Sequence, residues 1–571
     1  MKLYISKYFA LILLLLSPYV LAGESLQLKI TGMSGPAVKN AEERLVLSLQ
    51  SYGNDLSASE IQAFYQTAPK NITQALQPFG YFKATVSADR LIHQGHKWIA
   101  YFTISPGPVV SLTQVDVSLT GPGKNNAALR NLIANYPLKP GQIFQADQYE
   151  KAKDLLFQTA NNQGYIHAIL DKKEVQINLQ NNTAIIQLKM NTGPRYYFGA
   201  ISFSETPFSK TFLQRFLSFH EGDAFSSETL LKLQEDLSKS RYFENVVITP
   251  DLENIKNLTV PVHVDLTVPK AKQYNVGVGY GTFTGPRLTL GTDYRRVGDS
   301  GQHFTTQIKL SSVLSGLAAK YFIPGKNPLT DQYSLGADAQ KFSPKNGQSF
   351  SEKFSASYMK TLSEWQHNIT LNYLIERFQV NNNPSEVSRL LYPSYGLTRI
   401  KTDDLINPTR GSAITLNLQG ASKNILSATN FAQAELKAKY IFSPTVMSRV
   451  IVRGDVGYTA VNDLSRLPLT LRFFAGGLGS VRGYDYSSIG PGRYLETASV
   501  ELQHHVIGDF SGAVFYDVGT ATNHFNDKLF RGEGAGVVYN SIVGPVQLYV
   551  ARAMSKRGKP LTVEFSIGPS F

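Results

Sequence analysis

Hydrophobic and polar positions follow two different periods in the two halves of this 571-residue chain. Before about residue 270, stretches with apolar residues at every third or fourth position are mixed with short runs of strict alternation. That mixture is typical of amphipathic helices packed on half-buried strands. From about Gln273 the helical period disappears and only alternating strands remain. The pattern therefore predicts an α+β first half and an all-β second half.

The first half repeats one unit three times, at a spacing of about 80 residues. Each unit contains a strand, helical stretches, an aromatic corner and two more strands. The three corners are Gly80-Tyr81-Phe82, Gly164-Tyr165-Ile166 and Arg241-Tyr242-Phe243. We predict three tandem β-α-α-β-β modules over residues 23–106, 107–192 and 193–269. Small three-stranded sheets leave edges that accept an extended segment of a partner, although inert spacers are the alternative.

The chain starts with the pattern of a secretory signal peptide. Lys2 and Lys7 precede an apolar run from Phe9 to Leu16, and small residues follow up to Ala22. The run is shorter than a membrane-spanning helix needs, so we predict a signal peptide over residues 1–22 and an exported chain. Without another long apolar segment, membrane insertion would require a closed β-barrel.

The second half has strands with one apolar face and one face of glycine or charge. Tyr274, Val276, Val278 and Tyr280 share one face of the first such strand, with polar and glycine residues between them. Lipid-facing strands of a transmembrane antiparallel barrel have this alternation, and residues 270–571 have room for about 16 of them. A β-sandwich with one solvent-exposed face is the alternative. The final strand also alternates and ends on Phe571, which we interpret as an outer-membrane targeting signal.

Composition and short motifs limit which metal sites, binding partners and enzymatic activities the chain can have. The formal net charge is +13 and cysteine is absent, which removes disulfides and thiolate metal sites. For an exported chain, this charge favours an anionic lipid or lipopolysaccharide surface over nucleic acid. The Gly-x-Gly-x-Gly runs at 277–281 and 532–536 have a period of two, unlike phosphate loops, and His504-His505 lacks zinc-site spacing. We expect no cofactor, no metal and no enzyme; an outer-membrane lipase with a Ser/His/acid site is the enzymatic alternative.

One glycine-rich stretch places a charge where a folded-in loop is expected. Phe474-Ala475-Gly476-Gly477 is followed by Val481, Arg482, Gly483 and Tyr484. Glycines let the backbone reverse, and the arginine then supplies one fixed charge to an enclosed polar space. We call residues 481–484 the latch loop; an ordinary turn between strands is the alternative.

Several motifs occur in an order that resembles the Omp85 superfamily. They are Asn407-Pro408-Thr409-Arg410-Gly411, the latch loop, Phe515-Tyr516-Asp517-Val518-Gly519, Gly532-Glu533-Gly534-Ala535-Gly536, and Ser566-Ile567-Gly568-Pro569-Ser570-Phe571. Each motif is weak alone, and the order is what carries the resemblance. The three modules resemble the POTRA domains of that superfamily. With them, the mature chain is similar to the TamA-like outer-membrane subunits of the translocation and assembly module.

The resemblance implies a role for each part. The latch loop would fold into the barrel interior, where Arg482 would pair with Asp517 or, second, with Glu501. Phe515, Asp517 and Gly519 share one face of their strand, which agrees with an inward Asp517. Gln503 and Tyr549 depart from the family pattern, so the resemblance assigns them no pairing.

The implied function is assembly or translocation of β-barrel or autotransporter-type proteins. The modules would dock unfolded outer-membrane substrates, and POTRA 1 would bind a periplasm-spanning, inner-membrane-anchored, TamB-like partner. The barrel would open laterally between its first and last strands, the gate strands marked by Val276, Val278, Phe565 and Ile567. A two-partner secretion transporter and a passive porin stay as alternatives, though the first typically has two such modules and the second does not explain the repeats.

Overall fold

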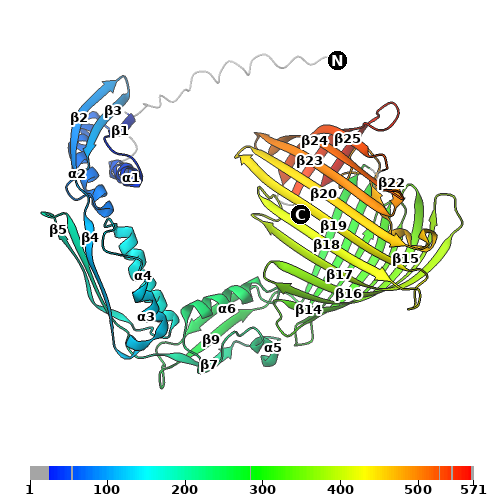
Figure 1. Cartoon of the computed structure of the whole chain (residues 1–571), viewed down its shortest axis with the longest axis horizontal. Helices are drawn as coiled ribbons and strands as arrows, with labels where there is room; N and C mark the ends of the chain where they lie inside the picture. Colours follow the sequence, from blue (N-terminus) through cyan, green and yellow to red (C-terminus); the bar gives the residue numbers. More distant parts are fainter. Residues whose placement is uncertain (1–24, 53–55, 283–284, 526, 542–543, 568–571) are drawn as a thin grey trace, which may run out of the picture. The chain divides into compact units, whose positions relative to one another are not determined.

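The computed structural model describes residues 25–52, 56–282, 285–525, 527–541 and 544–567. The predicted signal peptide and Phe571 lie outside these residues. The predicted fold class is confirmed: three small α+β sheets precede a 16-stranded antiparallel sheet (Figure 1). The described residues pack into two compact units. One unit contains the first two modules and part of the third, and the other contains the rest of the third module and the barrel.

The first module has the predicted β-α-α-β-β order. Its elements are β1 (Ser25–Thr31), α1 (Pro36–Gln50), α2 (Ala58–Leu76), a 3₁₀ turn η1 (Gln77–Phe79), β2 (Thr85–Gln94) and β3 (Lys97–Ser105). The sheet order is β1-β3-β2, so β1 and β2 are its edges. Helix α2 begins with a capping box between Ser57 and Glu60. Its apolar face, including Phe64 and Ile72, packs with Phe102 of β3 in the core.

The second and third modules repeat this order. The second has β4 (Ser111–Thr120), η2 (Pro122–Asn125), α3 (Ala127–Ala134), α4 (Ala146–Asn162), β5 (Ile169–Asn178) and β6 (Thr183–Asn191). The third has β7 (Tyr197–Phe203), α5 (Lys210–Gln214), α6 (Ser227–Lys239), β8 (Asn245–Pro250) and β9 (Thr259–Thr267). Gly164 at the second corner has φ +90°, and a Cβ there would lie 2.5 Å from the Tyr196 carbonyl oxygen. Both facts explain why that corner needs glycine.

The barrel strands follow one another around a single sheet, so the predicted count of about 16 is confirmed. The first eight are β10 (Lys272–Gly281), β11 (Gly285–Val297), β12 (Gln302–Leu310), β13 (Leu314–Pro324), β14 (Asp331–Phe342), β15 (Gly347–Leu362), β16 (Trp365–Val380) and β17 (Glu386–Thr402). The others are β18 (Gly411–Ala421), β19 (Phe431–Thr445), β20 (Ser448–Val461), β23 (Tyr494–Ile507), β24 (Phe510–Thr522), β25 (Phe530–Ser541), β26 (Gly544–Ala553) and β27 (Leu561–Ile567).

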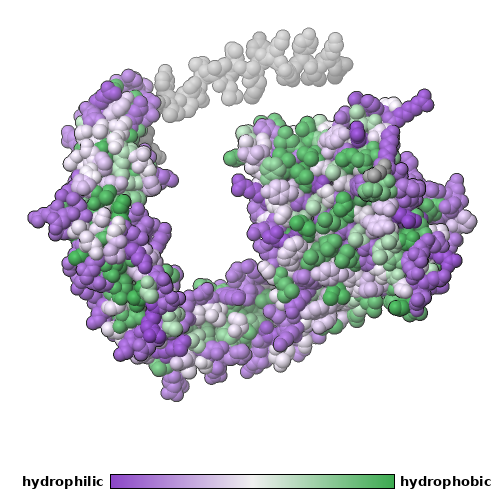
Figure 2. All heavy atoms as spheres, in the orientation of Figure 1, coloured by the Kyte–Doolittle hydropathy of each residue, from purple (hydrophilic) through white to green (hydrophobic). Residues whose placement is uncertain are grey.

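The strand faces alternate as a lipid-exposed barrel requires. In β16, Ile369 and Leu371 are half exposed on the outside, whereas Thr370, Asn372 and Glu376 are buried inside. Figure 2 shows hydrophobic residues gathered across the barrel wall, with hydrophilic residues towards the end that carries β22. Among the described residues, no helix has the length and apolar character to cross a membrane.

A short helix of the third module packs on the barrel turns beside it. Arg215, just after α5, donates to the carbonyl oxygens of Pro324 (3.1 Å), the last residue of β13, and of Lys326 (3.3 Å), which follows it. Phe212 lies against Gly301 in the β11–β12 turn, where a Cβ would be 2.4 Å from its ring. These contacts identify the end of the barrel with the β11–β12 and β13–β14 turns as the module side, which is the periplasmic side in the outer membrane.

Candidate functional site

The long connection from β20 to β23 builds the site. It contains two 3₁₀ turns, η3 (Leu464–Arg466) and η4 (Leu469–Leu471), and a two-stranded sheet of β21 (Phe473–Ala475) and β22 (Ile489–Gly492). Between β21 and β22 the backbone reverses at Gly476 and Gly477, which have φ of +107° and +89°. These left-handed conformations favour glycine, and they lead directly into the latch loop.

Arg482 is held against Asp517 of β24 in a bidentate ion pair. Its Nε and Nη2 donate to the two carboxylate oxygens at 2.7 and 2.8 Å, and its backbone N–H donates to the same carboxylate at 3.0 Å. Ser499 also donates to this carboxylate, at 2.6 Å. Arg482 is 1% exposed and Asp517 is fully buried. The fork of the guanidinium matches the carboxylate, so the pair fixes the loop in one orientation.

Glu501 of β23 is the second partner of Arg482, and two neutral side chains support it. Nη1 of Arg482 donates to one Glu501 oxygen. The other oxygen accepts from the Tyr549 hydroxyl at 2.7 Å and from the Gln503 amide at 2.5 Å. Gln503 and Tyr549 are the two positions that depart from the family pattern. The structure shows that they bind the carboxylate as neutral donors, which the sequence alone did not reveal.

Two aromatic rings enclose the guanidinium. The Arg482 carbon Cζ lies 3.5 Å from the ring centroid of Phe515 and 5.0 Å from that of Tyr549. The two rings meet edge to face, with centroids 5.4 Å apart. A desolvated cation over aromatic faces gains cation–π attraction, so these rings stabilise the charge while excluding water from the ion pairs.

The glycines of β25 make room for this packing. A Cβ at Gly532 would lie 2.0 Å from the carbonyl oxygen of Arg482. Side chains at Gly534 and Gly536 would meet the rings of Phe515 and Tyr549 at 2.6 and 2.5 Å. These positions therefore need glycine because they face a crowded part of the barrel interior.

The rest of the latch loop contacts the last two hairpins. The Gly483 N–H donates to Glu564 of β27 at 2.5 Å, and the Tyr484 hydroxyl donates to the Arg531 carbonyl at 3.1 Å. Glu564 is fully buried, and its Oε2 has no hydrogen-bond partner in the described part of the chain. Sequence reasoning missed Glu564, although its place between outward Val563 and Phe565 indicated an inward side chain.

A cross-lumen contact is made by the turn that carries the Asn-Pro-Thr-Arg-Gly motif. Asn407 donates to the Ser541 carbonyl of β25 at 2.9 Å, and Arg449 of β20 donates to the Pro408 carbonyl at 2.7 Å. Asp403 organises the turn by accepting from the backbone N–H groups of Thr409 and Arg410. Asp403 is exposed, and the slight desolvation of its carboxylate opposes ionisation, but these hydrogen bonds outweigh it and lower its pKa to about 2.

The arrangement holds a loop in place and lacks the parts of a metal site. Among the residues with a described placement, no group of three or more His, Asp and Glu residues could hold a metal ion. His504 instead pairs with the Ser448 hydroxyl at 2.9 Å. The paired Arg482 cation in its buried cage restrains the backbone that carries it.

Comparison with protein-family models decides the family. The model of the Omp85 superfamily domain matches residues 270–571, more than half of the chain. The chain belongs to the Omp85 superfamily. A model described as POTRA domain TamA domain 1 matches residues 27–106, and one described as surface antigen variable number repeat matches residues 196–268.

Similar proteins of this superfamily carry the name outer membrane protein assembly factor BamA. The one from Nitratidesulfovibrio vulgaris is 22% identical over 433 residues, covering 72% of this chain and 53% of that protein. The one from Neisseria meningitidis serogroup B is 21% identical over 407 residues, covering 63% and 48%. The chain thus spans about half the length of these relatives.

The fold is also similar to a solved Omp85 structure. The crystal structure of BamA from Haemophilus ducreyi lacking POTRA domains 1–3 superposes with a TM-score of 0.67 at 17% identity. The match covers 80% of this chain and 99% of that one. At this identity the likeness shows a shared fold.

The predicted gate strands of this Omp85 chain lie at the two ends of the barrel sheet. No backbone ladder joins β10 to β27 within the described residues, which omit 283–284 and 568–571. The Phe565 N–H instead donates to the Thr282 hydroxyl at 3.2 Å. Val276, Val278 and Ile567 are 72%, 80% and 44% exposed on the outer face. The structure thus places Phe565 beside Thr282.

A cavity of about 450 Å³ lies inside this seam. Its lining includes Arg287 and Lys309 on inward positions of β11 and β12, Leu478 of the β21–β22 connection, and Glu564. The cavity therefore joins the seam, the residues just before and after the latch loop, and the last strand in one space.

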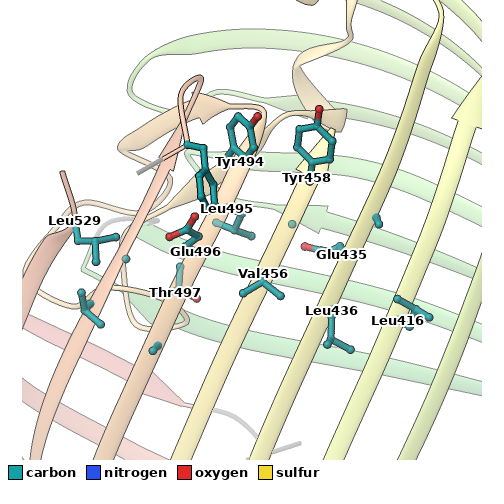
Figure 3. A pocket seen from close by; sticks show the side chains of 16 residues that line it. Leu416, Glu435, Leu436, Val456, Tyr458, Tyr494, Leu495, Glu496, Thr497 and Leu529 are labelled. Atoms are coloured by element: carbon teal, nitrogen blue, oxygen red, sulfur yellow. The ribbon is translucent and has the colours of Figure 1, made fainter. Parts of the chain in front are cut away.

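A larger hollow of about 780 Å³ lies on the outer wall, away from the latch loop (Figure 3). Leu436, Val456 and Tyr494 from β19, β20 and β23 line it on the lipid-facing side, and Leu529 closes one end. Glu496 shares the outward face of β23 with them. An apolar hollow on this side is part of the membrane-facing surface and adds nothing to the lumen site.

Proposed function

We propose that this protein assembles or translocates other outer-membrane proteins, with substrates that include β-barrel and autotransporter-type proteins. Membership of the Omp85 superfamily supports this, as does the name assembly factor carried by relatives that match much of the chain. The barrel acts as a template for incoming strands, in keeping with the assembly-factor name that these relatives carry.

The modules are proposed to work as docking units over residues 23–106, 107–192 and 193–269, ahead of the barrel at 270–571. Each sheet has two edge strands, such as β1 and β2 in the first module, and an edge strand can pair with an extended polypeptide. The match of the first module to a TamA-type domain supports a periplasm-spanning, inner-membrane-anchored, TamB-like partner at POTRA 1. Phe571 is retained as the proposed targeting signal.

The observation that carries the proposal is the open seam. Among the described residues, strands β10 and β27 meet through the Thr282 to Phe565 hydrogen bond, and no backbone ladder joins them there. In hydrocarbon, each unpaired backbone group costs several kcal/mol. An incoming strand that pairs with the β10 edge would satisfy those groups before it loses its water, which is the physical basis for lateral insertion.

The latch loop is proposed to govern that seam. Arg482 anchors the loop to Asp517 and Glu501, and Gly483 connects it to Glu564 on β27. Because β27 is one edge of the seam, separation of β27 from β10 changes the position of Glu564 and pulls on the loop. The gate residues Val276, Val278, Phe565 and Ile567 then belong to strands that move apart.

Covalent closure of the seam tests the proposal. Cysteines introduced at Thr282 and Phe565 in the full-length chain, joined by a short thiol crosslinker, should stop insertion of a barrel substrate into proteoliposomes. The matched control pair, Val276→Cys with Leu290→Cys, joins strands that are already paired in the ladder and should leave insertion intact. Insertion at the control rate with the seam closed would refute lateral opening.

The docking role has a separate test. A photocrosslinking residue at Gln27 on edge strand β1, in the full-length protein in its own envelopes, should capture a large inner-membrane-anchored protein. Capture of one secreted exoprotein instead would favour two-partner secretion.

A further inference from the structure

A strip of cations lies on the outward face of strands β14, β16 and β17. Lys341 of β14, Arg377 of β16 and Arg389 of β17 are exposed, and each alternates with inward residues such as Glu376, Ser388 and Leu390 that are buried. Their side chains therefore point outward from the wall. No hydrogen bond or ion pair to these three side chains is found among the described residues.

The strip lies at the extracellular boundary of the membrane. The modules precede β10, so β14 and β16 run away from the periplasm and β17 returns. A tilted strand crosses the hydrocarbon in about 9–11 residues, whereas β16 and β17 have 16 and 17. Arg377 and Arg389 lie among the strand residues that extend beyond the hydrocarbon at the extracellular ends. Lys341 has the same position, next to the end of β14. They are therefore at headgroup level.

The register gathers the three charges into one patch. Lys341 and Arg377 lie directly opposite Phe350 of β15, on its two sides. Arg377 is paired with Val387, which makes Arg389 its diagonal neighbour at about 7–8 Å. Glu352 lies on the same face, one row closer to the membrane centre. With three cations and one carboxylate, the patch keeps a net positive charge.

Below the patch, the same wall is apolar. Leu335, Phe354, Ile369 and Leu371 are each at least half exposed on the outer face of β14, β15 and β16. A ligand that fits both parts has an anionic head and several apolar chains. Arginine binds phosphate in a bidentate manner, and clusters of basic residues beside an apolar wall are typical of lipid headgroup sites.

We propose that this patch binds the phosphate-bearing headgroup of a multiply acylated lipid in the extracellular leaflet. The proposal depends on the barrel spanning the membrane and is independent of the assembly function. The occupant is a membrane lipid rather than free phosphate, because the apolar wall directly below the cations needs acyl chains to cover it. Such a lipid would stabilise the long β15–β17 wall on the side of the barrel opposite the seam strands.

The test uses the purified full-length protein and lipid A as the probe, with native mass spectrometry to count bound lipid. Wild type should retain bisphosphoryl lipid A in preference to the form without phosphate. The double variant Arg377→Gln/Arg389→Gln should bind it roughly 10- to 30-fold more weakly, as expected from about 1 kcal/mol per cation at a membrane surface. The control Arg287→Gln/Lys309→Gln removes the same charge from the lumen side and should bind as wild type does.

Three results would overturn the proposal. The first is equal retention by wild type and the outer double variant. The second is displacement of the lipid by inorganic phosphate at a similar concentration, because the acyl chains would then contribute nothing. The third concerns Glu352→Gln, which should bind as tightly as wild type or tighter. Weaker binding would mean that a divalent cation bridges the carboxylate to the lipid, in place of direct contact with the arginines.

Discussion

Replacing Arg482 with methionine is expected to release the latch loop, because the change strands two buried carboxylates. Asp517 is fully buried and Glu501 is 3% exposed. The side chain of wild-type Arg482 provides two hydrogen bonds to the first and one to the second. Removing one partner of a buried ion pair costs about 3–5 kcal/mol. The equilibrium between docked and released loop should therefore shift towards release by roughly 100- to 5,000-fold.

Cysteine accessibility measures this shift directly, since the chain has no cysteine of its own. Val481 is fully buried next to Arg482, so Val481→Cys should react slowly with a water-soluble maleimide while the loop is docked. Gly479 is exposed, and a side chain there would meet open space. Gly479→Cys therefore reports the reaction rate of a fully accessible position. In the Arg482→Met background, the cysteine at position 481 should react with the maleimide almost as fast as the cysteine at position 479.

A triple variant separates stranded charge from lost packing. Arg482→Met combined with Glu501→Gln and Asp517→Asn removes both carboxylate charges together with the cation. Replacing all members of a buried ion-pair network at once often leaves the free energy of unfolding almost unchanged. Its rate at 481 should return most of the way to wild type. If the triple variant reacts as fast as Arg482→Met alone, stranded charge is not what releases the loop and the reasoning fails.

Three further predictions concern other contacts. Gly301→Val should push the Phe212 ring away and make the short helix of the third module more sensitive to protease, and unchanged cleavage would contradict the contact. Gly532→Ala should displace the latch loop and speed labelling at position 481, whereas Gly454→Ala, whose nearest neighbour would be at 3.7 Å, should not. Asp403 has a lowered pKa, so it stabilises its turn fully above about pH 4, and this is lost as the pH falls through about 2. The NMR signals of that turn should titrate in this window, and in Asp403→Asn they should stay constant.

Some parts of the site were predictable because they depend on local pattern. Alternation along β24 places Asp517 on the inward face, and the glycines before Arg482 allow the reversed backbone that brings the loop inside. Both are properties of a few consecutive residues. The motif order then related Arg482 to Asp517, whose geometry the structure describes.

Other parts could not be read in advance, because they depend on which strands the loop reaches. Gln503 and Tyr549 lie on β23 and β26, and only the closed barrel brings both to one Glu501 oxygen. Because Gln503 and Tyr549 depart from the family pattern, the resemblance alone assigned them no partner. In the structure a neutral amide and a phenol donate the hydrogen bonds instead, which the residue types permit but do not require.

The architecture follows from the residue pattern alone: three α+β modules from their repeated helical and strand periods, and a barrel of about 16 strands from its apolar outer and polar inner faces. Those features follow from the residue pattern because each position must suit water, lipid or the protein interior, and because backbone groups in the membrane must be hydrogen-bonded. Contacts between distant segments needed the folded barrel: Glu564 binds the latch loop, Phe565 meets Thr282 at the seam, and three cations that are distant in sequence form one outer patch. The physical reason is that register and strand tilt accumulate around a barrel, so contacts between distant strands depend on the whole sheet and not on any segment within it.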